Sequence, residues 1–262
     1  MADTEHKVVS HEEWIAARRE LLAEEKEYSR LGDTLAKQRR ELPWERVGKD
    51  YVFDTPTGKE SLSQLFAGRS QLAVYHFMFG PEWETGCPHC SFWADNFNGI
   101  DIHLAHRDVT FVAISHAPIA KIEAFKKRMG WNFKWVSAGE NGFNYDYGVS
   151  FRPEDIAKGE IFYNYRNSPR TGSELPGASA FYKNASGEIF HTYSTYERGL
   201  DVLNGTYHWL DRMPKGRDEE GLPAPQSWVR HHDRYPAEKA SDPAAGYEPP
   251  GKVRQFERAE KA

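Results

Sequence analysis

The chain has 262 residues, mixed charges that sum to -5, and only two cysteines. It is long enough for one large domain with additions, and its core needs no disulfide staples. The balanced charge gives no electrostatic footprint for nucleic acid or a membrane surface, so we expect neither partner. No apolar run approaches the roughly 20 residues of a membrane helix, and the polar start lacks the layout of a signal peptide. We therefore expect a cytoplasmic protein.

The first predicted element is a long helix between Ser10 and Pro43. Ser10 and Glu13 have the spacing of a capping box, in which each side chain satisfies the other residue's backbone amide. Helix formers follow without interruption, and the charged runs along them are typical of solvated faces. We assign residues 1–49 to a helical extension.

The next elements alternate between strands and helices. Residues 51–54 predict a short strand, followed by a turn and a helical turn at 61–66. The nearly continuous apolar run at 72–79 is typical of a central parallel strand covered on both faces. Residues 109–115, which are rich in β-branched side chains, predict a second buried strand.

A helix should follow each of these buried strands. Apolar positions after Pro88 keep one helical face and continue past Gly99, so we expect a kink there rather than an end. Pro118 opens the next helix and Gly130 ends it. Residues 131–177 are irregular and aromatic, and we interpret them as an insertion with short elements of its own.

The last predicted elements are a hairpin at 178–193 and a closing helix at 200–210. A βαβα unit followed by a ββα unit is the thioredoxin arrangement. We therefore predict an α/β, thioredoxin-like fold over residues 50–213, with a mixed central sheet and helices on both faces. Residues 214–262, which are rich in proline and charge, form a C-terminal extension that we expect to drape over the surface or to extend away from it.

The chemistry is concentrated in a CXXC motif, Cys87-Pro88-His89-Cys90. Cysteines one helical turn apart can close a small disulfide with little backbone movement. At a helix start the dipole favours a thiolate, so we expect Cys87 to be the exposed nucleophile and Cys90 the resolving thiol. Pro88 suits the first helical position. His89 adds partial positive charge, which favours the reduced form and shifts the redox-active pair toward the oxidising end.

The motif resembles the active site of disulfide oxidases of the thioredoxin superfamily. A wider set of segments lies at residues 92–95, 130–137, 143–151 and 191–196. Together these segments resemble a bacterial family of thioredoxin-like proteins, domain of unknown function 899, labelled as predicted dithiol-disulfide oxidoreductases. The resemblance extends from the first helix to Arg217, and it implies a fold and a reaction class but no substrate.

Two departures from the superfamily pattern concern the substrate site. Gly86 stands where a tryptophan usually precedes the first cysteine, although Trp83 lies close by. Pro176 is the candidate for the cis-proline that faces the disulfide, but it stands about one residue early. We assign Trp83 and Pro176 to substrate binding, and the natural substrate need not be an extended polypeptide.

Three other functions stay open. A metal protein would need His89, His103, His106 or His116 to converge on the cysteines. A non-catalytic binding module would use the insertion and the N-terminal helix as a partner or homodimer surface. A thiol peroxidase of the peroxiredoxin type would share the fold, but its proline and threonine positions are occupied here by Gly80 and Glu84.

We therefore predict a dithiol-disulfide oxidoreductase that needs no organic cofactor and no metal. Its partner is a thiol or disulfide, either a protein or a small molecule. Six aromatic residues of the insertion give a further hypothesis, that they wall a small-molecule pocket over the disulfide; a second small core is the alternative. These residues are Trp131, Phe133, Trp135, Phe143, Tyr145 and Tyr147.

Overall fold

The computed structural model describes residues 6–169 and 172–236, and contacts divide the chain after Trp44 into two units. The first unit is built on helix α1 (His11–Glu41). The Ser10 hydroxyl accepts a hydrogen bond from the Glu13 amide at 3.2 Å, and the Glu13 carboxylate accepts one from the Ser10 amide at 3.0 Å. The predicted capping box and helix are confirmed.

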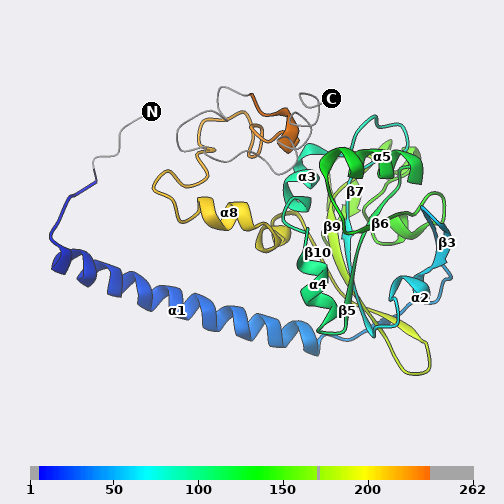
Figure 1. Cartoon of the computed structure of the whole chain (residues 1–262), viewed down its shortest axis with the longest axis horizontal. Helices are drawn as coiled ribbons and strands as arrows, with labels where there is room; N and C mark the ends of the chain where they lie inside the picture. The colour runs from blue at the N-terminus through cyan, green and yellow to red at the C-terminus, as the bar shows by residue number, and fades with distance from the viewer. Residues whose placement is uncertain (1–5, 170–171, 237–262) are drawn as a thin grey trace, which may run out of the picture. The chain divides into compact units, whose positions relative to one another are not determined.

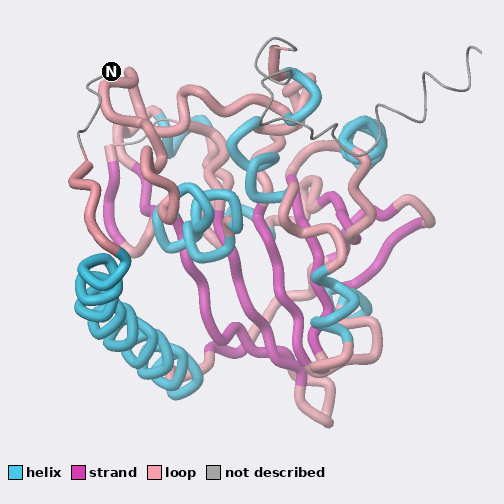
Figure 2. The backbone as a smooth tube through the Cα atoms, turned by 60° about the vertical axis from the view of Figure 1, so that its left-hand side comes forward, coloured by secondary structure: helices cyan, strands magenta, loops and turns pink. Residues whose placement is uncertain are grey.

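The second unit is organised around one sheet, seen in Figure 2 as the row of magenta strands. Within the described residues this sheet has eight strands in the order β1-β10-β9-β4-β5-β6-β2-β3. The strands are β1 (Glu45–Arg46), β2 (Val52–Thr55), β3 (Gly58–Ser61), β4 (Gln71–His76), β5 (Val109–Ser115), β6 (Lys134–Ser137), β9 (Gly177–Lys183) and β10 (Ile189–Tyr196). A separate hairpin pairs β7 (Ile161–Tyr163) with β8 (Arg166–Ser168).

The pairing of the central strands confirms the α/β, thioredoxin-like fold. Strands β4, β5 and β6 run parallel, and β9 runs antiparallel to both β4 and β10. The strand that leads to the cysteines, β4, therefore lies in the middle of the sheet, between the next parallel strand and the C-terminal hairpin.

Helices cover both faces of the sheet. Figure 1 shows α3 and α4 along one side and α2 on the other. The helices of this unit are α2 (Leu62–Leu65), α3 (Pro88–Ala94), α4 (Ile100–Ala105), α5 (Ile119–Met129), α6 (Phe143–Asp146), α7 (Pro153–Ile156) and α8 (Gly205–Leu210), with 3-10 turns η1 (Glu197–Leu203) and η2 (His232–Arg234).

Alternation along the strands produces two separate cores. Successive side chains of a strand point to opposite faces. In β4, Leu72 and Val74 pack with the buried residues of α2, whereas Tyr75 joins the core that contains both cysteines and Phe125 of α5. The site therefore lies on the face of the sheet that α3 and α5 cover.

Three predictions about the elements are wrong. Helix α3 ends at Ala94, and Gly99, with a φ of 90° that glycine adopts readily, is the N-cap of the separate helix α4, so there is no continuous kinked helix. Within the insertion, β6 is a strand of the main sheet. The closing helix is divided into η1 and α8, because the Asn204 side chain caps α8 by accepting from the Tyr207 amide.

None of the helices described for residues 6–169 and 172–236 combines the length and the apolar character that crossing a bilayer requires.

Candidate active site

The connection from β4 to α3 places the redox motif. Cys87 is the N-cap of α3 and Pro88 its first residue, as predicted, and Cys90 follows one turn later. The Cys87 amide donates to the carbonyl of Met78 at 3.0 Å, and the Met78 amide donates to the Cys90 sulfur at 3.4 Å. These two bonds hold both cysteines against Met78, two residues after the end of β4. Both are free thiols.

Neither cysteine is exposed. Cys87 has 8% of its surface accessible and Cys90 has 2%. The prediction that Cys87 would be exposed is wrong, because residues 219–235 pass over the motif; we call them the covering segment. Its residue Val229 is buried in the same core as the two cysteines.

The two thiols are shifted in opposite directions. The pKa of Cys87 lies well below its usual value, chiefly because Cys90 hydrogen-bonds to its sulfur, with His89 adding to the effect against the opposing cost of burial. Burial, and then the neighbouring Cys87, hold the pKa of Cys90 well above its usual value. A hydrogen bond to Cys87 raises the pKa of His89. The arrangement can stabilise one thiolate and keep its neighbour protonated.

Tyr75 is a residue of this site that sequence reasoning missed. Its side chain is 1% exposed, and its hydroxyl is buried without a hydrogen-bond partner among the described residues. Burial, and next the charge of Cys90, raise the pKa of Tyr75 well above its usual value. The sequence offers no signal for this role, because Tyr75 sits inside an apolar strand and looks like any other core aromatic.

A hollow of about 440 Å³ opens beside the motif. It includes Pro176, His89 and Cys90 but not Trp83, which packs across Gly80 and contributes to the core instead. No peptide bond in the described residues is cis, so the bond before Pro176 is trans. The lining residues are Tyr75, Met78, His89, Cys90, Trp93, Tyr163, Leu175, Pro176, Glu197, Arg198, Leu200, Asp201, Pro225 and Gln226.

The aromatic residues of the insertion do not wall this hollow. Trp131, Phe133 and Trp135 are buried core residues on the face with the cysteines, and Phe143 belongs to the core on the opposite face. The small-molecule hypothesis based on these rings is therefore wrong. The insertion reaches the hollow through Tyr163, Leu175 and Pro176 instead.

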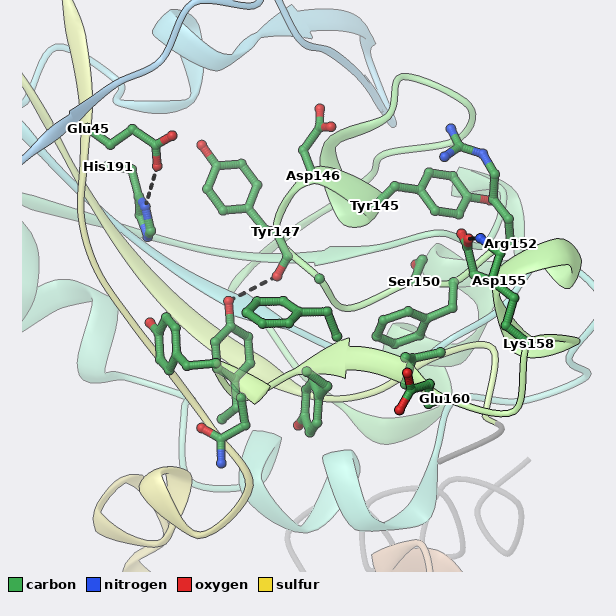
Figure 3. Close-up of a pocket in the computed structure, with 18 residues that line it drawn as sticks. Glu45, Tyr145, Asp146, Tyr147, Ser150, Arg152, Asp155, Lys158, Glu160 and His191 are labelled. Atoms are coloured by element: carbon green, nitrogen blue, oxygen red, sulfur yellow. Dashed lines mark hydrogen bonds and ion pairs between the residues drawn. The ribbon is translucent and has the colours of Figure 1, made fainter. Parts of the chain in front are cut away.

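Tyr145 and Tyr147 line a second hollow, of about 590 Å³ (Figure 3). Figure 3 shows Arg152 beside the ring of Tyr145, and the guanidinium carbon lies 4.4 Å from the ring centre. Neither cysteine lines this hollow, and Tyr163 is the one residue that it shares with the hollow beside the motif.

The histidines considered as metal ligands do not gather around the cysteines. Within residues 6–169 and 172–236, no three His, Cys, Asp or Glu side chains are grouped so that they could hold a metal ion. His103 and His106 are exposed. His116 is buried, and its Nδ1 lies 3.0 Å from the carboxylate of Glu174, which raises the pKa of His116.

Solved structures with similar backbones are distant from this chain. Peroxidoxin BcpB from Mycobacterium tuberculosis is 14% identical, with a TM-score of 0.41, over 63% of this chain and 95% of that chain. A structure of peroxiredoxin Q from Xanthomonas campestris is 11% identical, with a TM-score of 0.41, over 59% and 87%. A provisionally named protein disulfide isomerase from Bacteroides thetaiotaomicron is 18% identical, with a TM-score of 0.34, over 64% and 91%. At these values the likeness says nothing about activity.

No protein of curated function matches the chain. The family model described as "Bacterial protein of unknown function (DUF899)" matches residues 3–235. This match covers nearly the whole described chain, including the redox motif and the covering segment. The chain therefore belongs to the DUF899 family of bacterial proteins, as its resemblance to domain of unknown function 899 implied.

Proposed function

We propose that the chain is a dithiol-disulfide oxidoreductase in which Cys87 is the nucleophile and Cys90 the resolving thiol. The observation that carries this proposal is geometric: Cys87 is the N-cap of α3 with Pro88 directly after it, and Cys90, one turn later, lines a hollow beside the motif. The pKa of Cys87 is lowered and that of Cys90 is raised, which are the directions that a nucleophile and a resolving thiol need. Pro88 and His89 tune the pair, Pro88 by fixing the turn and His89 by supporting the thiolate.

The reaction proceeds through a mixed disulfide. The Cys87 thiolate attacks one sulfur of a substrate disulfide, a new sulfur-sulfur bond forms, and the other substrate sulfur leaves as a thiolate that takes up a proton. Cys90 then loses its proton and attacks the Cys87 sulfur, which releases the second substrate thiol and closes the Cys87-Cys90 disulfide. Two electrons pass from the protein to the substrate, and an external dithiol returns them; the reverse sequence delivers a disulfide.

The neighbouring side chains have separate tasks in this proposal. His89 hydrogen-bonds to Cys87 and so favours its thiolate, and the same hydrogen bond raises the pKa of His89. Tyr75 and Cys90 line the same hollow, and the Tyr75 hydroxyl, which has no hydrogen-bond partner among the described residues, can donate to the Cys90 sulfur as that thiol ionises. Pro176 forms part of the wall against which a substrate sulfur would lie. Trp83, outside the hollow, has no substrate contact in this scheme.

A redox titration in glutathione buffers tests the proposal. We expect a single two-electron transition between about -270 and -120 mV, with the fraction of the Cys87-Cys90 disulfide measured by alkylation and mass spectrometry. Metal content and peroxide turnover are measured on the same sample. A pair that never closes, or thiols that react only after metal is stripped, would refute an oxidoreductase. Rapid consumption of peroxide without disulfide reduction would assign the thiolate to a peroxidase.

A further inference from the structure

The covering segment crosses the redox motif on both sides of Cys87. The His231 Nε2 donates to the carbonyl of Gly86, the residue before Cys87, at 2.8 Å. The His89 Nε2, between the two cysteines, lies 3.2 Å from the carbonyl of Gln226. The segment is thus held to the motif itself and not only to the surrounding surface.

One end of the covering segment is fixed by charged side chains. Arg128 of α5 donates two hydrogen bonds to the Asp233 carboxylate, at 2.9 and 2.8 Å, and one to the His231 Nδ1 at 3.1 Å. His232 lies 2.7 Å from Asp95, just after α3. Since Nδ1 of His231 accepts and Nε2 donates, this imidazole is neutral, which agrees with the burial that lowers its pKa.

A single carboxylate fixes the other end. Glu219 accepts hydrogen bonds from the hydroxyl of Tyr207 at 2.8 Å, the indole of Trp228 at 2.7 Å and the amide of Gln226 at 3.0 Å. The Trp228 ring also packs edge-on against Phe92 of α3, with centroids 5.4 Å apart. These contacts fix the covering segment in place beside the redox motif.

This cover restricts what can reach the cysteines. A protein disulfide would have to lay several residues of backbone along the motif, where the covering segment already hydrogen-bonds on both sides of Cys87. One approach to the motif is the hollow of about 440 Å³, a size within the range of small-molecule sites; it reaches His89 and Cys90, the neighbours of Cys87, whereas Cys87 itself does not line it. Its walls are mostly apolar, with Glu197, Arg198 and Asp201 among the charged lining residues.

We propose that the site acts on low-molecular-weight disulfides or thiols with an apolar body and excludes protein disulfides. This inference rests on the proposed oxidoreductase function, and it adds the substrate class. The exchange is the one written above, with a small organic disulfide accepting two electrons and leaving as two thiols. The segment sets specificity by occupying the position that a peptide would need.

The first experiment measures access without any disulfide chemistry. Reduced full-length protein is treated with iodoacetamide or with a maleimide carrying a long polyethylene glycol chain, and Cys87 modification is followed by mass spectrometry. We expect the small reagent to react at least about tenfold faster, after correction for the rates with unfolded protein. In Asp233→Asn, which loses the paired hydrogen bonds to Arg128, that ratio should fall severalfold. Asp155→Asn, which breaks a surface pair with Lys158, is the matched control and should leave the ratio unchanged.

The second experiment compares two oxidants, 2-hydroxyethyl disulfide and insulin, in stopped-flow oxidation of the reduced protein. We expect the small disulfide to react at least about a hundredfold faster than insulin. In Asp233→Asn the ratio of the two rates should fall about tenfold. Circular dichroism checks that this variant keeps its fold. Equal rates with both oxidants would overturn the substrate class and leave the oxidoreductase in place. Failure of both oxidants to close the disulfide would instead overturn the oxidoreductase itself. Unchanged ratios in Asp233→Asn, in both experiments, would show that the segment does not control access.

Discussion

On one face of the central sheet a buried ionisable group favours its charged form, and on the other face a buried group favours its neutral form. On the face covered by α3, Cys87 is 8% exposed, yet its pKa is lowered, so the charged form is favoured. On the opposite face, His76 is 1% exposed, and burial lowers its pKa to about 3, so the neutral form is favoured. His76 follows Tyr75 directly in β4, so one peptide step separates the two environments.

The difference comes from the partners and not from the depth of burial. Burial penalises charge on both faces. Cys87 gains charge support from Cys90 and His89, whereas the Nε2 of His76 lies 2.7 Å from the neutral hydroxyl of Ser179. Partners decide the charge of His116 as well, since Glu174 raises its pKa although it is buried. We call the face that holds the two cysteines the reactive face.

On the reactive face, removing each thiol in turn should have the largest effect on activity. Cys87→Ser should lower the rate of disulfide reduction at least ~1,000-fold, since the proposed nucleophile is lost. Cys90→Ser should stop after the first step and accumulate a mixed disulfide on Cys87, detected by mass spectrometry of the whole protein. The reverse pattern, with the mixed disulfide on Cys90 of the Cys87→Ser variant, would exchange the two roles.

On the opposite face, His76 should make the fold less stable at acid pH. An unfolded histidine has a pKa near 6.5, and the folded value is about 3, so between these values only the unfolded chain takes up the proton. The free energy of unfolding should therefore fall as the pH drops, by up to roughly 1.4 kcal/mol per pH unit from this group. His76→Gln should flatten the slope in urea titrations, whereas the exposed His106→Gln should not; equal slopes in all three proteins would contradict this.

Close packing beneath the motif gives a smaller expected effect. A Cβ atom at Gly86 would lie 2.6 Å from the Phe125 ring and 2.7 Å from the Phe77 ring. Both rings are buried, so Gly86→Ala should destabilise the fold by about 1–3 kcal/mol and displace Cys87. Gly48, where a Cβ would meet nothing within 4 Å, provides the control as Gly48→Ala. Thermal unfolding of the two variants side by side tests the prediction, and equal stabilities would refute it.

The smallest expected change concerns His89. His89→Gln should raise the pKa of Cys87, measured by thiolate absorbance, and slow alkylation at neutral pH by roughly three- to tenfold. The pKa of His89 is itself raised by Cys87, so its charge supports the thiolate below that pKa, and the support is lost as the pH rises through it. His103→Gln, on an exposed helix position, should change neither quantity. A Cys87 titration that His89→Gln leaves in place would assign the effect to Cys90 alone.

The sequence predicts best those features whose cause is local. Strand β5 has the predicted bounds, and helix α5 ends at Gly130 as expected, because their apolar spacing and terminating residues lie within the elements themselves. The position of Pro88 at the start of α3 is equally local. The absence of a tryptophan at Gly86 also has a physical reason, since the two phenylalanine rings fill that space.

Features with distant causes could not be predicted. Strand β6 is four residues long and joins the sheet only through its pairing with β5 and β2, so it has too few residues to show a period. At the motif, the covering segment makes one hydrogen bond to each of Gly86 and His89, about 140 positions earlier in the chain. Irregular backbone with distant anchors leaves no periodic pattern, so the sequence does not predict the burial of Cys87.

The hydrogen bonds to the Cys87 sulfur also link redox state to fold stability. They favour the thiolate, a species that exists only when the pair is reduced, and the disulfide encloses too short a loop to restrict the unfolded chain much. Around a closed thermodynamic cycle, any free energy that the fold adds to the reduced form must appear as an equal gain in the oxidising strength of the disulfide. In the proposed reaction, closing the disulfide therefore removes an interaction that stabilises the fold, and reducing the disulfide restores that interaction.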